Sequence, residues 1–509
     1  MGDQPQTAAA RRAAIGGLLI VVLLACLFFG FVFWVQIAKW RSFHYACFDY
    51  SNVAGILEET ANGHFRFQDP THIYSQILAP IFLPYFLLYL LHRGPETLMA
   101  ATAFFFATGI VMIYLAARRV FRDVWVPLLF SISLMLNPIY DVASLSGFRL
   151  AATVIPGAIG AFLAHRARRK GWFIACVALM CASQINIVPC VFVLGLAMWL
   201  ADRDDRYARL TMIFSAVWFV ATLAAVAIFS RATGIPFPAK ITHFAAFGGS
   251  AGEIARTLFT RPGFVLSQLF YRQNLTLLLC FVPLLGLPLA GPVWLAAALP
   301  ELGYIALSTY GHTQLDPRTS WATHLHDPWF SFFTTGFATI MPFVYLAAIA
   351  GAQRVGVWLS KRWTRLWRPT TRWIGITAFL LLTLFIHYEF TPGDYGPVPL
   401  TRHARFADIE VTAHDRLARE MLASLDRSKM YLMPDLYYFL AYDFPVRYQL
   451  RETEDFNRPF DYLIFDEKIP CPQMGDVVCR QKLQQALADP RFEVVRQMDG
   501  LYLLARKHP

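Results

Sequence analysis

Long apolar runs separated by short basic clusters dominate the first 388 residues of the chain. A membrane-spanning helix needs about 20 mostly apolar residues, and eleven segments approach this description. They cover residues 13–36, 95–117, 123–141, 143–165, 171–184, 186–201, 208–230, 274–290, 292–309, 329–352 and 371–388. Segments 171–184 and 186–201 are short, which favours broken or tilted helices. The pattern therefore predicts an α-helical polytopic membrane protein with about eleven transmembrane helices.

The basic residues between these runs predict the topology. They form clusters at Arg11/Arg12, Arg118/Arg119/Arg122, Arg166/Arg168/Arg169/Lys170 and Arg203/Arg206/Arg209, with a fifth run at 354–372. With eleven spans all five clusters fall on one side, and positive loops are typically cytoplasmic. We therefore expect a multi-pass protein of the cell (inner) membrane with a cytoplasmic N-terminus. Loops 37–94, 231–273 and 310–328 and the C-terminal part would then lie outside.

Residues 77–91 allow two interpretations. The segment is apolar but short, and it contains Pro80 and Pro84. We expect a helix lying in the outer interface within the first outer loop, 37–94. The alternative is a true span, which would move Arg118, Arg119 and Arg122 to the outside.

The last 120 or so residues change character. Residues 408–426 and 475–487 have helical patterns, whereas 429–433, 462–465, 493–497 and 501–505 resemble strands. Asp499–Gly500 is a hairpin signal between the last two strands. The sequence therefore predicts two domains, a transmembrane domain at 1–388 and a small extracytoplasmic α/β domain at 389–509.

Composition supports a membrane protein. Only 16% of residues are charged, whereas soluble domains carry about 25%. The net charge of +11 resides in clusters that topology explains, so we expect membrane lipids as partners and no nucleic acid. Six of the eight cysteines lie in or beside apolar segments. Cys471 and Cys479 lie in the polar C-terminal part, where a disulfide and two separate thiols are both compatible with the sequence.

Ionisable residues near apolar segments are energetically expensive and often mark functional sites. Here acids and histidines gather on the predicted outer side. The set comprises His44, Asp49, Glu58, Glu59, His64, Asp69, His72, Asp141, Arg149, Lys240, His243, Glu301, His312, Asp316, Arg318, His324, His326 and Asp327. A carboxylate can act as general base on a hydroxyl, while cations hold a phosphate leaving group. The alternative is that outer loops are polar simply because they face water.

Two carboxylates stand out in this set. Asp49 follows the first apolar run closely and is the strongest candidate for a catalytic base, although it also suits the N-cap of a helix opening at Ser51. Glu301 follows Pro300 inside the ninth predicted span. It either lines a polar cavity or is a buried structural side chain.

A series of short motifs resembles one family. They are Cys47-Phe48-Asp49-Tyr50, Phe65 to His72, Pro80 with Pro84, Asn137-Pro138, Phe148-Arg149, Thr242-His243-Phe244, Gly248-Gly249-Ser250, Leu299-Pro300-Glu301-Leu302, His326-Asp327-Pro328-Trp329-Phe330 and Phe460 to Asp466. In this order and spacing they resemble the domain-of-unknown-function 2079 family of predicted membrane proteins. That family is similar to the GT-C superfamily of membrane glycosyltransferases.

The resemblance implies an activity and roles for individual residues. It implies inverting transfer of a sugar from a polyprenyl-phosphate donor to a glycan, lipid or protein acceptor on the outer face. Asp49 matches the catalytic acid by position, and 77–91 matches the interfacial helix. For such a transferase, the ionisable residues named above lead us to expect that donor phosphate or substrate contacts His64, Asp69, His72, Arg149, His243, Glu301, Arg318, His326 and Asp327.

Two motifs depart from the family pattern. Members often have Phe-His where this chain has Phe148-Arg149, and Lys-Glu-Asp-like residues where it has Gln184-Ile185-Asn186. Because those acids are missing, we expect no metal, and no cofactor is expected either. Two other functions stay open, a membrane transporter or lipid flippase and a non-catalytic protein of envelope assembly.

Overall fold

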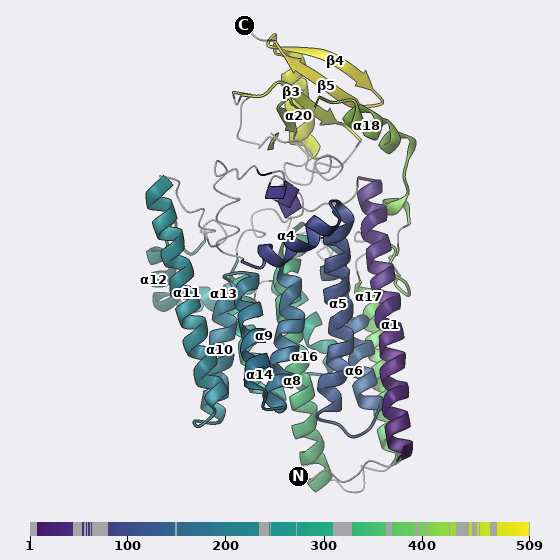
Figure 1. The fold of residues 1–509 in the computed structure, drawn as a ribbon, viewed down its shortest axis with the longest axis vertical. Helices are drawn as coiled ribbons and strands as arrows, with labels where there is room; N and C mark the ends of the chain where they lie inside the picture. Colours follow the sequence, from purple (N-terminus) through teal and green to yellow (C-terminus); the bar gives the residue numbers. More distant parts are fainter. Residues whose placement is uncertain are drawn as a thin grey trace.

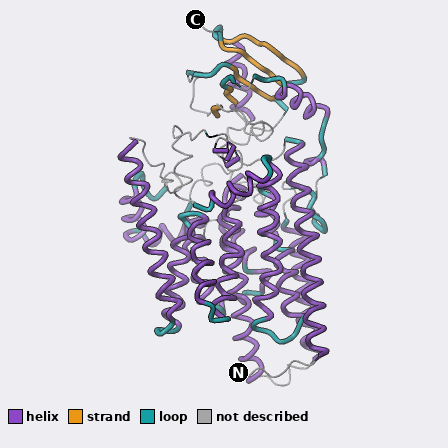
Figure 2. Tube along the Cα trace, viewed as in Figure 1, coloured by secondary structure: helices purple, strands orange, loops and turns teal. Residues whose placement is uncertain are grey.

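The protein consists of a helical membrane part and a small C-terminal sheet (Figures 1 and 2). The computed structural model describes residues 8–43, 53–54, 57–58, 60–61, 63, 80–147, 150–233, 244, 246–270, 272–308, 328–362, 369–391, 396–402, 404, 406–426, 428–433, 447–449, 456–457, 459–468 and 476–507.

Five helices are long and apolar enough to cross a membrane. They are α1 (Ala8–Arg41), α5 (Pro95–Arg118), α11 (Arg206–Thr233), α16 (Pro328–Arg362) and α17 (Pro369–Phe390). The bent pair α6 (Trp125–Met135) and α7 (Pro138–Leu145) makes a sixth candidate span. The chain is therefore a membrane protein with several apolar helices.

The remaining apolar helices are shorter than a bilayer. They are α4 (Phe82–Leu91), α8 (Val154–Arg166), α9 (Lys170–Ser183), α10 (Ile187–Ala201) and α14 (Pro292–Leu307). At about 1.5 Å per residue, even a 16-residue helix measures only about 24 Å, against a hydrocarbon core of about 30 Å. The prediction of about eleven spans is therefore not confirmed.

One predicted span is broken where the chain is described. Residues 123–141 were expected to form one helix, but α6 and α7 meet at a bend of 52°. Pro138 cannot continue α6, because it lacks an N–H, and Asn137 caps the new helix by accepting from the backbone N–H of Ile139 at 3.0 Å. The next predicted segment, 143–165, likewise begins with a 3-10 turn, η1 (Leu150–Thr153), before α8.

A second correction concerns residues 274–290, which were expected to be an α-helix. They form three 3-10 segments, η3 (Arg272–Cys280), η4 (Val282–Leu284) and η5 (Leu287–Ala290). Pro283 and Pro288 remove backbone donors, and Gly286 adopts a left-handed φ of 68°. The loop predicted before this segment contains two short helices, α12 (Ala251–Thr260) and α13 (Pro262–Leu269).

The Gly248-Gly249-Ser250 motif begins α12. The Ser250 hydroxyl accepts from the backbone N–H of Glu253 at 3.3 Å. In return, the Glu253 carboxylate accepts from the backbone N–H of Gly249 at 2.8 Å. This arrangement is close to a capping box, so the motif starts a helix.

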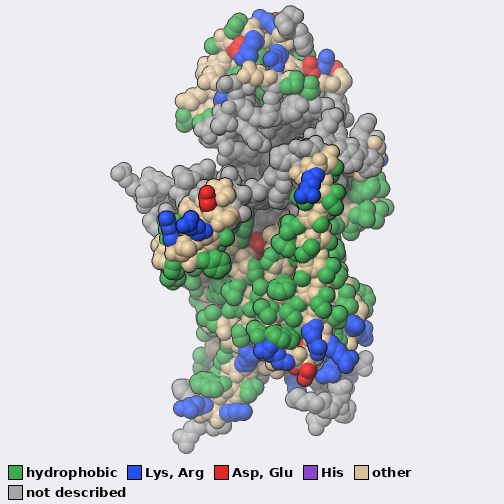
Figure 3. Space-filling model, turned by 90° about the vertical axis from the view of Figure 1, so that its left-hand side faces the viewer, with side chains coloured by type: hydrophobic (Ala, Val, Ile, Leu, Met, Phe, Trp, Pro, Cys, Tyr) green, Lys and Arg blue, Asp and Glu red, His purple; other side chains and the backbone are tan. Residues whose placement is uncertain are grey.

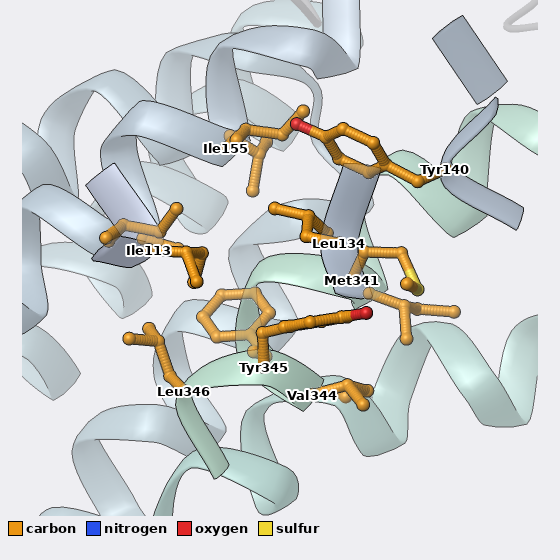
Figure 4. Packing of buried hydrophobic residues seen from close by; sticks show 14 of the residues in the cluster. Ile113, Leu134, Tyr140, Ile155, Met341, Val344, Tyr345 and Leu346 are labelled. Atoms are coloured by element: carbon orange, nitrogen blue, oxygen red, sulfur yellow. The ribbon is translucent and has the colours of Figure 1, made fainter. Parts of the chain in front are cut away.

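The helices of the membrane part share one apolar core (Figure 4). Helix α16 packs against α14, α8 and α7, and Tyr345 on α16 is fully buried. Its hydroxyl lies 3.1 Å from the Ser133 Oγ on α6, and the Tyr140 hydroxyl donates to the Phe106 carbonyl at 2.6 Å. Close packing and satisfied polar groups, more than water exclusion, hold helices together in lipid.

The connections that carry the arginine clusters lie at one end of the helical part. In Figure 1 the α5–α6, α8–α9 and α10–α11 connections and the C-terminal end of α16 are all at the lower end, far from the sheet. Figure 3 shows many of the Lys and Arg side chains of that face at the same end. We call this the arginine end, and the opposite one the domain end. Helix α4 lies at the domain end.

The C-terminal part contains a five-stranded sheet of order β2-β1-β3-β5-β4. The strands are β1 (Tyr431–Met433), β2 (Arg447–Gln449), β3 (Tyr462–Asp466), β4 (Phe492–Met498) and β5 (Leu501–Arg506). Strands β1, β2 and β3 pair in parallel, whereas β5 is antiparallel to both β3 and β4. The four predicted strands are confirmed, but β2 was not predicted.

Two helices cover the two faces of this sheet. Helix α18 (Ala413–Ala423) packs on the face that carries Tyr431, Ile464 and Leu503. Helix α20 (Asp476–Ala488) packs on the face that carries Leu463 and Leu504. The alternation of side chains along each strand therefore builds two small cores.

A buried histidine joins α18 to the sheet. His414 Nε2 lies 2.8 Å from Asp466 at the end of β3. Its Nδ1 lies 3.0 Å from Asp499 in the β4–β5 turn, and Lys468 forms an ion pair with Asp499. The imidazole is only 9% exposed. Its two contacts link the first turn of α18 to the end of β3 and to the β4–β5 turn.

Candidate functional site

Glu301 is a buried carboxylate of the membrane part. It lies on α14 directly after Pro300 and is 3% exposed. Asn186, the N-cap residue of α10, donates from Nδ2 to both carboxylate oxygens, at 3.1 and 3.2 Å. Because an amide is neutral, Asn186 orients the carboxylate without neutralising it.

The neighbourhood of Glu301 is polar on the side where α14 ends. Asn274 donates from Nδ2 to the Ala306 carbonyl of α14 at 2.8 Å and to the Gln268 carbonyl of α13 at 2.8 Å. Tyr304 follows Glu301 by one turn, and its ring contacts Phe244 at a centroid distance of 5.4 Å. Helix α14 thus contacts α10 through Glu301, and near its C-terminal end it contacts Asn274 and Phe244.

A second buried acid pairs with a histidine. Asp141 of α7 lies 3.2 Å from Nδ1 of His387 on α17, and the two side chains are 5% and 2% exposed. The Nε2 of His387 lies 2.9 Å from the carbonyl oxygen of Pro399. The pair thus joins α7 to α17 and to the chain that leads into the C-terminal part.

The partners of His387 assign one of its protons. A carbonyl oxygen only accepts, so Nε2 of His387 carries a hydrogen. Nδ1 lies 3.2 Å from the Asp141 carboxylate and 3.4 Å from the Thr391 hydroxyl. A histidine beside a buried carboxylate lowers the cost of burying the acid. Both ring nitrogens are engaged, which favours a structural role.

The described surface of the membrane part has one visible hollow on the face that Figure 3 shows. It lies toward the domain end and has an acidic side chain at its floor. On one side the hollow is bordered by a projecting part of the described surface that carries basic and acidic side chains. A concave surface with few polar groups is the usual setting of a binding site.

Of the residues predicted for catalysis, for donor or substrate binding, or for the disulfide, only two lie in the described part of the chain. Glu301 is buried as described above, and Cys479 on α20 is 7% exposed. The others lie outside the described residues: Asp49, His64, Asp69, His72, Arg149, His243, Arg318, His326, Asp327 and Cys471. Their roles, and the Cys471–Cys479 disulfide, stay predictions.

The sequence interpretation missed two partners of the buried acids. His387 lies at the end of an apolar run, and an ionisable residue there is itself a signal. In the sequence, Asn186 stands out only as part of a departure from a family motif. Where the chain is described, no group of three His, Cys, Asp or Glu side chains is arranged to hold a metal ion. Absence of a metal from the whole site stays a prediction.

Comparison with known proteins gives a family. No curated protein matches the chain. A family model described as "Predicted membrane protein (DUF2079)" matches residues 39–503, which is most of the chain and includes both buried acids. The chain therefore belongs to the DUF2079 family of predicted membrane proteins.

Proposed function

We propose that the protein transfers a sugar, with inversion, from a polyprenyl-phosphate donor to an acceptor at the domain end of the membrane part. The observation that carries this proposal is the buried Glu301, which accepts from Asn186 at 3.1 and 3.2 Å within the helical part. The loops rich in acids and histidines begin and end at the same end of the helices. The arginine clusters lie at the other, which supports an outer-face site.

In this mechanism Asp49 accepts the proton of the acceptor hydroxyl. The acceptor oxygen attacks the anomeric carbon, the bond from that carbon to the phosphate oxygen breaks, and polyprenyl phosphate leaves. Arg149, His243, Arg318 and His326 provide cations for the departing phosphate. His64, Asp69, His72 and Asp327 complete the substrate contacts, and Glu301 shapes the cavity.

The test is lipid mass spectrometry of cells that lack the gene. We expect a polyprenyl-phosphate sugar to accumulate and to return to its normal level when the wild-type gene is restored. Asp49→Asn should fail to restore it, whereas Asp204→Asn, an exposed acid in the α10–α11 turn, should succeed. Full restoration by Asp49→Asn at wild-type protein levels would remove Asp49 from the mechanism.

The break between α6 and α7 supports a second candidate, a lipid transporter. Discontinuous helices with ionisable residues near the break are common in transporters, and Asp141 lies on α7 just after the 52° bend. A transporter would move a labelled polyprenyl-phosphate sugar across proteoliposomes without changing it covalently. A transferase would release polyprenyl phosphate.

A further inference from the structure

Phe43, which follows α1 closely, lies inside the C-terminal part. Phe43 is 1% exposed and belongs to the same core as Ala418 and Leu422 of α18 and Leu501 of β5. Its φ is +57°, in the left-handed region that normally favours glycine after a helix. A bulky residue is strained there, so burial of the ring offsets a backbone cost. The end of α1 is therefore inserted into the second domain.

Helix α18 also caps α1. The Arg419 guanidinium donates to the carbonyl oxygens of Trp40, at 3.4 Å, and of Arg41. It lies over the Trp40 ring at 5.4 Å and over the Phe43 ring at 5.0 Å. The last carbonyls of a helix have no partner within the helix and carry partial negative charge. The Arg419 guanidinium both donates hydrogen bonds to these carbonyls and offsets their partial negative charge.

The C-terminal part is tied to the membrane part at a second place. The backbone N–H of Arg402 donates to the Tyr388 carbonyl of α17 at 2.9 Å, and Pro399 accepts from His387. Arg402 also pairs with Glu389 at 2.9 Å. Attachment at two helix ends restricts rotation of the domain, which one flexible linker would allow.

From these contacts we propose that α18 sets the position of the first long loop, with Phe43 and Arg419 as positioning residues. Asp49 follows Phe43 by six residues in the sequence, so the loop that carries it starts at this anchor. A displaced α18 would move the origin of the loop that carries the proposed base. This inference rests on the proposed function for its catalytic consequence, but the contact itself does not.

The experiment compares three variants of the full-length protein in lipid nanodiscs and in cells that lack the gene. Arg419→Gln removes the cation, and Arg419→Lys keeps the charge. Arg416→Gln is the matched control, since Arg416 is exposed on the same helix one turn earlier. Hydrogen exchange at 38–43 reports the contact, and lipid mass spectrometry of the polyprenyl-phosphate sugar reports transfer.

We expect Arg419→Gln to speed exchange at 38–43 roughly tenfold, because a hydrogen bond to a charged group contributes about that factor. The donor lipid should accumulate in cells that carry this variant, with thermal stability unchanged. Arg419→Lys should restore both readouts in part, and Arg416→Gln should match wild type. A structural contact without functional consequence would speed exchange and leave the lipid at its wild-type level.

Two results would overturn the proposal. One is unchanged exchange at 38–43 in Arg419→Gln, and the other is faster exchange with full transfer. If Asp49→Asn cells also show no accumulated donor, the glycosyltransferase proposal fails instead. The α1–α18 contact is then decided by the exchange result alone.

Discussion

At the scale of single residues, the described membrane part contains two buried acids with different partners. Asp141 has a histidine at 3.2 Å, and Glu301 accepts from the amide of Asn186. An imidazole can carry a positive charge, whereas an amide stays neutral. The two acids therefore differ in the chemistry of the side chain that contacts them.

His414 predicts a pH dependence of the C-terminal part. Its hydrogen bond to the Asp466 carboxylate, followed by that to Asp499, raises the pKa of His414 above its ordinary value of 6.5. A raised pKa adds stability that is complete below pH 6.5 and is lost as the pH rises through the folded-state value. The hydrogen bonds with Lys468 and then His414 lower the pKa of Asp499 below 3.8. Its contribution is complete above that pH and is lost as the pH falls through the lowered value.

We therefore expect hydrogen-exchange protection of α18, corrected for intrinsic rates, to be highest between about pH 4 and 6.5 and to fall above it. His414→Gln should remove the alkaline step. His92→Gln should keep it, since the His92 side chain is 68% exposed and belongs to another part of the molecule. Protection that stays constant through the alkaline range in wild type would show that His414 does not hold α18.

At the scale of elements, glycines set how closely α16 approaches η5 and α14. A Cβ on Gly291 would lie 2.1 Å from the Ala347 carbonyl oxygen, and one on Gly351 would lie 2.0 Å from the Leu287 carbonyl oxygen. Both neighbours are backbone atoms, which, unlike a flexible side chain, cannot move away by changing rotamer. Small residues at such crossings let membrane helices pack closely.

Gly291→Ala and Gly351→Ala should each lower the thermal stability of the purified protein, by at least the 1–3 kcal/mol or so typical of overpacking. Gly303→Ala is the matched control on α14, because nothing lies within 4 Å of its added Cβ. Alanine is also favoured over glycine in helices by about 1 kcal/mol. Equal midpoints for Gly291→Ala and Gly303→Ala in detergent would contradict the close approach.

The same elements show what sequence patterns can predict. Helices α1, α5, α11, α16 and α17 follow from uninterrupted apolar runs, and strands β4 and β5 follow from the Asp499–Gly500 turn, where both residues have positive φ. Hydropathy does not distinguish an α-helix from the 3-10 segments at 272–290. Local proline and glycine chemistry decides that difference. The three-residue strand β2 carries too little periodicity to be recognised.

The candidate site was less predictable than the fold. Glu301 was predicted because Pro300 and a charge interrupt an apolar run. Its partner Asn186 lies 115 positions earlier, and His387 lies far from Asp141 in sequence. Such pairs arise from tertiary packing, which a single sequence does not encode in a readable pattern. The insertion of Phe43 into the second domain has the same cause.

At the scale of the whole molecule, every functional proposal depends on which end faces the cytoplasm. Positive clusters at one end and the sheet at the other (Figures 1 and 3) favour a cytoplasmic arginine end. We expect Glu493→Cys on β4 to react with a membrane-impermeant maleimide in intact spheroplasts. Asp204→Cys in the α10–α11 turn should react only after permeabilisation. The unsubstituted protein corrects for the eight native cysteines.

The reverse labelling pattern would place the hollow and both buried acids on the cytoplasmic side. Sugar donors linked to nucleotides, rather than to polyprenyl phosphate, would then be the chemistry available to the site, and the outer-face transfer proposed here would fall. Labelling of both cysteines in intact spheroplasts, with no further rise on permeabilisation, would also contradict the expected sidedness. Helix α11 is long enough to cross the membrane, so its two ends should lie on opposite sides. The labelling therefore tests directly on which side the site lies.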